Sequence, residues 1–205
     1  MKGPAAPTSS STRVKPPTPP ANTSLKDPAK QKTSATIARA PRAKNDNYDF
    51  FLTHAWDVDH ANHLKVSKIN TLLKKKGFNT WFDEDRLIGD ILYQITSAIE
   101  KSKVILVFIT KDYHDKVNSI NERDYCLLEF RHAMNILGPQ GMIPIVMESS
   151  MKNTREWKGR VGAALASKMY YDFSEIIDWA DDSVALEECF EKFLPALRNH
   201  LLGSH

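Results

Sequence analysis

The side chain with the clearest chemical potential in this sequence is the carboxylate of Glu129, which can stabilise positive charge or move a proton. It lies in a stretch whose apolar residues recur at helical spacing, at Cys126, Phe130, Ala133 and Leu137. At about 100° per residue, Glu129 falls about 60° from the centre of this stripe, at the boundary between core and solvent. A cleft-lining carboxylate fits such an edge. The alternative is a solvated or ion-paired glutamate, because Arg131 and His132 follow closely.

Other chemistry is less well supported. His60 and His63, with Asp57 and Asp59, could be metal ligands, but two histidines three residues apart without a further fixed ligand are usually solvated. We therefore expect no metal site. The sequence contains neither G-x-G-x-x-G nor G-x-x-x-x-G-K-[ST], so neither a dinucleotide-binding dehydrogenase nor a P-loop enzyme is supported.

The composition of the chain changes near residue 46. Residues 1–46 hold 8 of the 11 prolines and none of the 19 aromatic residues, with 9 Lys or Arg against 2 Asp or Glu. Such a segment cannot form a core, so we predict a disordered basic Pro/Ser/Ala-rich linker or tail, with an organellar targeting sequence as the alternative. The net charge of +3 is thus a +7 tail on a −4 body. It gives no indication of nucleic-acid binding by the body.

The body also shows no sign of membrane insertion or of an oxidising compartment. Its longest apolar run, at 104–109, falls far short of the ~20 residues that cross a bilayer. Cys126 and Cys189 have no partner at disulfide or zinc-ligand spacing. We expect a soluble, cytoplasmic protein without membrane contacts.

Strand-like and helix-like patterns alternate after residue 46. Apolar or β-rich stretches predict strands at 48–54, 78–82, 103–109, 142–147 and 169–172. Helical periodicity is found at 61–77, after Asp90, around Glu129 and at 186–201. The stretch 110–124 is polar, and 152–167 is compatible with helix or loop.

Single residues refine these elements. We expect Asp90 to cap the start of the second helix and Gly77 to end the first. Pro144 predicts a peripheral place or a late start to the ladder for the fourth strand, and Pro195 predicts a kink in the last helix.

Alternating strands and helices predict an α/β fold. With five strands, the expected arrangement is a flavodoxin-like parallel sheet of order 2-1-3-4-5 with helices on both faces. Such a sheet places functional groups at the carboxyl ends of its strands, near the switch point between the first and third. The loops of interest are therefore 53–60, 83–90 and 110–125.

These loops carry three motifs that resemble those of Toll/interleukin receptor (TIR) domains. Residues 48–57, YDFFLTHAWD, are similar to the opening box of the bacterial-type members. Residues 77–91, GFNTWFDEDRLIGDI, look like the second strand, the BB loop and the start of the second helix. Residues 125–130, YCLLEF, resemble the family's W-C-x-x-E-L stretch. Their order and spacing agree, and residues 47–202 are identified as a TIR domain.

The resemblance implies one of two activities. Some TIR domains are non-catalytic scaffolds for homotypic TIR–TIR signalling, whereas others cleave NAD+ to nicotinamide and ADP-ribose or a cyclic form. For this chain we predict an NAD+ glycohydrolase that is activated by self-association and acts in immune or cell-death signalling. NAD+ is then the substrate, no separate cofactor is needed, and other TIR domains are candidate partners.

Glu129 occupies the position of the family's catalytic glutamate. Cleavage of the nicotinamide–ribose bond passes through an oxocarbenium-like ribose and releases a neutral base, so one carboxylate that stabilises the cation can suffice. The resemblance implies a nucleotide cleft lined by Thr53, His54, Ala55, Trp56, Trp81, Asp83 and Tyr125.

The binding residues leave two questions open. The aromatic rings could stack on nicotinamide or adenine, but core packing is the alternative for each and is favoured for Trp81. Plant and animal NAD-cleaving members usually have an arginine after the first strand, and this chain has none. Phosphate contacts would then come from backbone amides or from His54.

The BB-loop segment contains an apolar pair in charged surroundings. Leu87 and Ile88 can anchor the loop to its own domain or dock into a neighbour. In the family this loop often mediates head-to-tail assembly and can complete the active site across subunits. The resemblance therefore implies an oligomerisation loop formed by Leu87, Ile88, Gly89 and Asp90.

Overall fold

The computed structural model describes residues 47–82, 90–180 and 183–203. The predicted tail lies outside these ranges, as do Asp83 and the loop residues Leu87, Ile88 and Gly89. The predictions made for them remain predictions.

The described residues form a five-stranded parallel sheet of order β2-β1-β3-β4-β5, which confirms the predicted topology. Its strands are β1 (Tyr48–Thr53), β2 (Thr80–Trp81), β3 (Ser102–Ile109), β4 (Met142–Val146) and β5 (Tyr171–Asp172). The longest strand, β3, lies at the centre and pairs with β1 on one side and β4 on the other.

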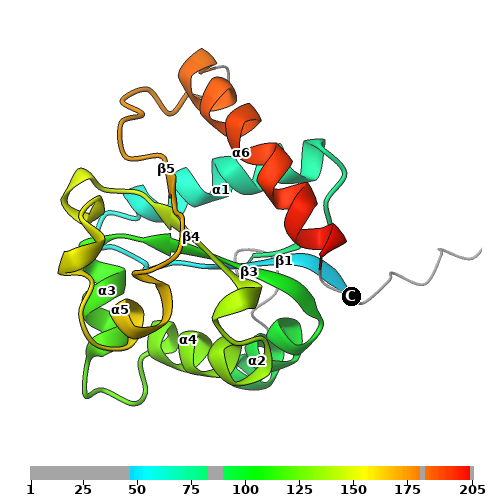
Figure 1. The fold of residues 1–205 in the computed structure, drawn as a ribbon. Coiled ribbons are helices and arrows are strands. Elements are labelled where there is room, and N and C mark those ends of the chain that lie inside the picture. The colour runs from blue at the N-terminus through cyan, green and yellow to red at the C-terminus, as the bar shows by residue number, and fades with distance from the viewer. Residues whose placement is uncertain (1–46, 83–89, 181–182, 204–205) are drawn as a thin grey trace, which may run out of the picture. The chain divides into compact units, whose positions relative to one another are not determined.

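Helices cover both faces of the sheet, as predicted (Figure 1). The α-helices are α1 (Ala61–Lys75), α2 (Ile91–Glu100), α3 (Lys111–Asn118), α4 (Tyr125–Ile136), α5 (Gly159–Leu165) and α6 (Val184–Leu202). Short 3-10 turns are found at η2 (Pro139–Gly141), η3 (Ser149–Met151) and η4 (Thr154–Glu156). Figure 1 shows α1 and α6 on one face and α2 to α5 on the other.

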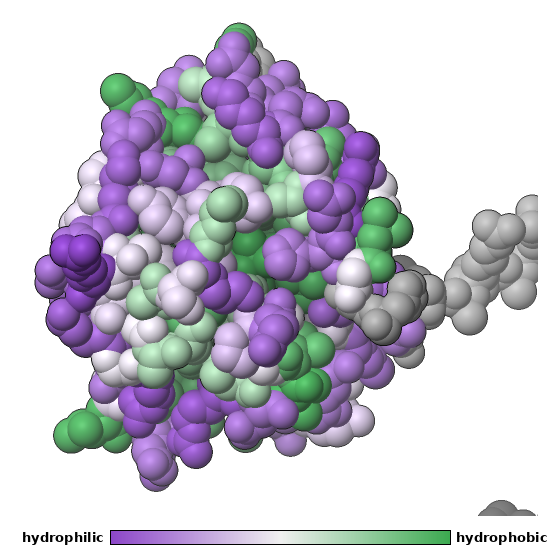
Figure 2. Space-filling model, in the orientation of Figure 1, coloured by the Kyte–Doolittle hydropathy of each residue, from purple (hydrophilic) through white to green (hydrophobic). Residues whose placement is uncertain are grey.

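Each face of the sheet has its own core. Along β1, Phe50 and Leu52 are buried with α1 and α6, while Phe51 is buried with the helices of the opposite face. This alternation follows from the two-residue period of a strand. Because both faces are covered, the central strand β3 is apolar on both sides from Val104 to Ile109. The face of the molecule in Figure 2 is mainly hydrophilic.

The predicted helix ends are confirmed. The Asp90 side chain accepts a hydrogen bond from the backbone N–H of Tyr93 at 3.1 Å and caps α2. Gly77, just after α1, has a φ of 88°, a left-handed conformation that glycine adopts without steric cost. Pro195 lies inside α6, which continues on both sides of it.

Several strand predictions differ from the structure in length or place. Strand β2 has only two residues instead of 78–82, and β5 likewise covers only the end of 169–172. Strand β4 is next to the edge, and its pairing with β5 begins at Ile145, just after Pro144. The proline, which lacks an N–H, therefore lies before the β5 ladder starts.

The sequence prediction missed α3. This helix begins after Thr110, whose hydroxyl accepts a hydrogen bond from the Tyr113 N–H at 3.1 Å. It buries only Tyr113, His114 and Val117 and fills its outer face with charged residues. Eight residues with so few apolar positions give too short a helical period to be recognised as a helix.

Candidate functional site

The Glu129 carboxylate lies where the end of β1 meets α4. Its side chain is only 7% exposed, and the Thr53 hydroxyl donates a hydrogen bond to Oε2 at 2.6 Å. Thr53 is the last residue of β1, so the carboxyl end of this strand contacts the side of α4 that carries Glu129. The sequence analysis placed Glu129 at the core boundary, because helical periodicity gives a residue's position on its own helix but does not show what packs against that helix. In the structure it is buried.

Thr53 links Glu129 to a second hydroxyl, that of Tyr113, at 3.1 Å. A threonine hydroxyl has one proton, and here it goes to Glu129, so the Tyr113 hydroxyl is the donor to Thr53. Burial raises the pKa of Tyr113 well above its ordinary value, with Cys126 and Glu129 adding to the shift. Tyr113 therefore keeps its proton, and the hydroxyl chain runs from Tyr113 through Thr53 to the carboxylate.

A cavity of about 310 Å³ opens in front of Glu129. This volume is at the lower end of the roughly 300–1,000 Å³ usual for small-molecule sites. Residues from the loop after β1 and from α2, α3 and α4 line it: His54, Trp56, Ile91, Ile95, Lys116, Asp124, Tyr125, Cys126 and Glu129. The cavity is thus at the carboxyl edge of the strands, as the fold class predicts.

Two aromatic rings of the cavity reach solvent. Trp56 is 42% exposed and Tyr125 is 48% exposed. The Trp56 ring is held in place by histidines, with its centroid 3.9 Å from that of His63 and 5.4 Å from that of His60. Both rings are therefore placed to contact a ligand as well as the protein.

His54 is buried behind this cavity and paired with another imidazole. Its Nε2 lies 2.7 Å from Nδ1 of His63, and its ring stacks with Phe82 at 5.3 Å between centroids. Because Nε2 is engaged in this pair, a phosphate contact through it would require the pair to separate.

The remaining predicted site residues have mixed positions. Ala55 is buried, and its carbonyl accepts a hydrogen bond from the Asn62 side chain at 3.1 Å. Trp81 is 3% exposed, stacks on Phe51 with centroids 4.5 Å apart, and is not among the residues that line the cavity. Its position matches the core-packing alternative.

Sequence reasoning missed Lys116, which reaches the cavity from α3. Its ammonium donates to the backbone carbonyl of Trp56 at 2.9 Å and to Asp112 at 2.6 Å. Lysine and aspartate four residues apart suggest an ion pair only on a helix. The spacing of Asp112 and Lys116 was visible in the sequence, but it indicates an ion pair only if α3 is known, and this helix was not predicted.

Cys126 is a further cavity residue to which the sequence analysis gave no site role. Burial raises the pKa of its thiol strongly, and the nearby carboxylates Glu129 and Asp124 add to the shift. The thiol contacts the carbonyl oxygen of His54 at 3.5 Å. The Cys126 side chain therefore lines the cavity as a protonated, weakly reactive thiol.

The described residues offer no cluster of three or more histidine, cysteine or acidic side chains that could hold a metal ion. Nor does any helix among them have the length and apolar character needed to span a bilayer.

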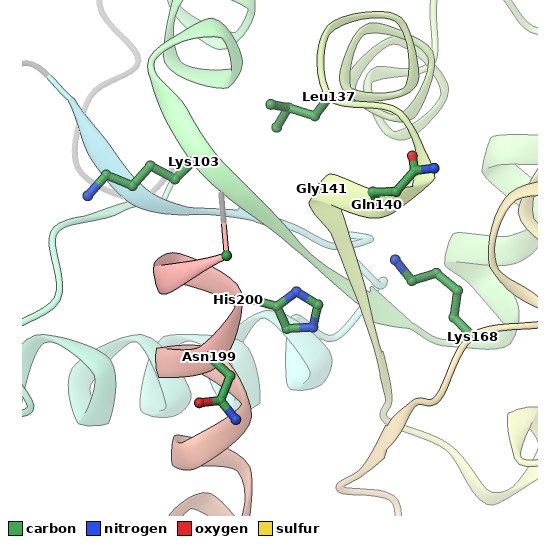
Figure 3. Close-up of a pocket in the computed structure, with 8 residues that line it drawn as sticks. Lys103, Leu137, Gln140, Gly141, Lys168, Asn199 and His200 are labelled. Atoms are coloured by element: carbon green, nitrogen blue, oxygen red, sulfur yellow. The ribbon is translucent and has the colours of Figure 1, made fainter. Parts of the chain in front are cut away.

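A second hollow, of about 610 Å³, lies at the amino ends of β3 and β4 (Figure 3). Lys168 and His200 project toward it from opposite sides, whereas Lys103 extends away and pairs with Asp49. Burial lowers the pKa of Lys168 and, together with the Lys168 charge, that of His200. The described residues that line this hollow include no carboxylate that could stabilise a developing positive charge. The cavity at Glu129 is therefore the candidate site.

Comparison with known proteins agrees with the observed fold. Residues 50–188 match a family model described as TIR domain. No curated protein matches the chain. One similar solved structure is that of the TIR domains of the activated Roq1 resistosome, which directly recognises the pathogen effector XopQ. The two sequences are 16% identical, and the alignment covers 74% of this chain and 99% of the Roq1 chain, with a TM-score of 0.50.

A metazoan TIR-STING receptor from C. gigas, solved in complex with 2',3'-cGAMP, is 13% identical. The alignment covers 75% of this chain and 41% of the receptor chain, with a TM-score of 0.47. At such identities the likeness to the Roq1 domains supports the fold of this chain and nothing beyond it.

Proposed function

Because the chain belongs to the TIR domain family, we propose that it is an NAD+ glycohydrolase with Glu129 as its catalytic residue. The reaction breaks the nicotinamide–ribose bond and gives nicotinamide and ADP-ribose or a cyclic form. The observation that carries the proposal is the buried Glu129 carboxylate, oriented by Thr53 and facing a cavity with two half-exposed aromatic rings.

The chemistry asks for one carboxylate and no general acid. Nicotinamide leaves as a neutral base, while positive charge develops on the ribose. A carboxylate in a cavity shielded from water stabilises that charge more strongly than it would in water. The hydrogen bond from Thr53 fixes the direction of the Glu129 carboxylate before substrate binds, so little reorganisation is needed during the reaction.

The cavity accommodates part of the substrate next to its two aromatic rings. Trp56 and Tyr125 offer exposed faces on which a planar base can stack. The volume of about 310 Å³ suits the nicotinamide riboside half of the substrate. The phosphates and adenosine would then extend toward the opening.

The decisive experiment measures nicotinamide release from NAD+ by chromatography at high protein concentration. Wild-type protein should release nicotinamide, and Glu129→Gln should lower the rate by about 10²-fold or more, the scale of losing one electrostatic stabiliser. Glu122→Gln is a matched control, because Glu122 is exposed just before α4. Thermal unfolding of each variant checks that the fold is intact.

Two outcomes would contradict the proposal in different ways. Absence of nicotinamide release from concentrated wild-type protein removes the glycohydrolase. Release that survives Glu129→Gln leaves the enzyme but removes Glu129 from its catalytic role.

A non-catalytic scaffold is the second candidate, and the first turn of α2 favours it. Leu92 is 46% exposed and Tyr93 is 70% exposed, directly after the predicted oligomerisation loop. Exposed apolar residues of this kind can form a contact with another TIR domain. Light scattering would show a scaffold as concentration-dependent assembly that Tyr93→Ser weakens, without nicotinamide release.

We also propose self-association as the activating step and the cytoplasm as the place of action. NAD+ is the substrate in this proposal, and the reaction needs no further cofactor. The Roq1 TIR domains belong to an activated resistosome. They support, by analogy, that TIR domains act in assemblies.

A further inference from the structure

NAD+ carries a negatively charged diphosphate, and the cavity around Glu129 also contains the acidic Asp124. The geometry points to Lys116 as the binding residue for this diphosphate. The inference rests on the proposed function, since it assigns a subsite to the same cavity. It also answers the question left by the missing arginine after β1.

Among the described residues that line the cavity, Lys116 is the one with a permanent positive charge. Its ammonium has three N–H donors. One donates to the carbonyl of Trp56 at 2.9 Å and one to Asp112 at 2.6 Å. Its remaining N–H can reach a ligand oxygen, because the side chain is 30% exposed.

The surroundings keep this lysine charged. Burial acts to lower its pKa, but the hydrogen bond to Asp112 and the charges of Asp112 and Asp124 outweigh it and raise the pKa. A fully protonated ammonium at a partly buried position makes a strong charge-assisted bond to a phosphate oxygen. Lys116 is therefore a cation at all physiological pH values.

The position of Lys116 also suits the order of groups along the dinucleotide. It contacts the backbone of Trp56, whose ring is exposed, whereas Glu129 is buried. A ribose at Glu129 and a base beside Trp56 or Tyr125 bring the phosphate that follows the ribose toward Lys116. His54, which the sequence analysis considered for phosphate contacts beside backbone amides, has its Nε2 engaged with His63.

The test separates phosphate binding from support of Trp56, because Lys116 could do both. Calorimetric titration in the Glu129→Gln background, in which turnover should be slow, compares NAD+ and ADP-ribose with nicotinamide riboside, which lacks a diphosphate. Lys116→Met should weaken NAD+ and ADP-ribose by about tenfold or more, the scale of one charge-assisted hydrogen bond. Nicotinamide riboside should bind unchanged, and Lys116→Arg should restore most of the affinity.

Two matched variants sharpen the result. Lys111→Met removes the other lysine of α3 that pairs with an aspartate four residues away, and it should leave all affinities unchanged. Asp112→Asn removes the carboxylate that partly neutralises Lys116, and it should tighten NAD+ and ADP-ribose only.

Equal losses for all three ligands would overturn the inference and show that Lys116 acts through Trp56. Unchanged NAD+ affinity in Lys116→Met, or undetectable NAD+ binding to the parent protein, would overturn it as well. The proposed function fails separately: ADP-ribose binding that depends on Lys116, without nicotinamide release by wild-type protein, removes only the glycohydrolase.

Discussion

Replacing Thr53 with valine tests whether the hydroxyl at the end of β1 prepares Glu129 for catalysis. Valine keeps the shape of threonine but removes the donor that lies 2.6 Å from Oε2. Since this bond stabilises the ionised carboxylate, its loss favours the protonated form, which cannot stabilise a cation. We expect activity to be lost first on the acid side of the pH profile.

The size of the effect follows from the hydrogen bond. A bond to a charged group is worth about 1.5–3 kcal/mol. One pH unit corresponds to about 1.36 kcal/mol, so the acid limb of the kcat/KM profile should move up by about one to two pH units. The buried Tyr113 hydroxyl also loses its partner, so the free energy of unfolding should fall by a further ~1–3 kcal/mol.

Two controls isolate the hydroxyl at Thr53. Thr53→Ser keeps the donor and should retain the wild-type pH profile. Thr80→Val removes a comparable buried bond, from Thr80 to the side chain of Asn70 at 2.6 Å, and neither residue is among those that line the cavity. It should lower stability without moving the profile. A folded Thr53→Val protein with an unshifted acid limb would refute the role given to this hydroxyl.

Three other predictions use separate parts of the molecule. The unfolded chain releases the Tyr113 proton near pH 10 while the folded state holds it, so stability should fall as pH rises beyond that value; Tyr113→Phe should flatten this slope in urea unfolding curves. Alkylation followed by mass spectrometry should label Cys189 before the more deeply buried Cys126, and faster labelling of Cys126 in native protein would contradict its assignment as an inert wall. Deleting 1–46 should leave the rate of NAD+ cleavage unchanged, and lost activity would show that this segment is more than a linker.

The fold could be predicted because its main signals are local. Residues of β3 are apolar on both faces, which requires helices on both sides of the sheet. Asp90 and Gly77 mark helix ends by their own backbone and side-chain chemistry. Such signals are found within a few residues of where they act, so a single sequence is enough to detect them.

The polar helix α3 is an element that local sequence patterns were not sufficient to predict. Its register is fixed by Tyr113 and Val117 packing into the core, and this packing cannot be seen without the sheet. Because α3 was not predicted, Lys116 had no assigned position, and the sequence analysis considered only backbone amides and His54 for phosphate contacts. The missed helix is therefore the reason why the sequence analysis did not find a cation that lines the candidate cavity.

The contacts that prepare Glu129 are long-range. Thr53 donates to it across 76 residues of sequence, Tyr113 contacts Thr53 across 60, and Lys116 contacts Trp56 across 60. A glutamate at this helix position is therefore compatible with either an enzyme or a scaffold. Under the proposed function, the enzyme differs from the scaffold in having a hydroxyl that orients the carboxylate and a cation that holds the diphosphate. The Thr53 and Lys116 variants address these two conditions separately, and a TIR domain that keeps the glutamate but lacks both should bind partners without cleaving NAD+.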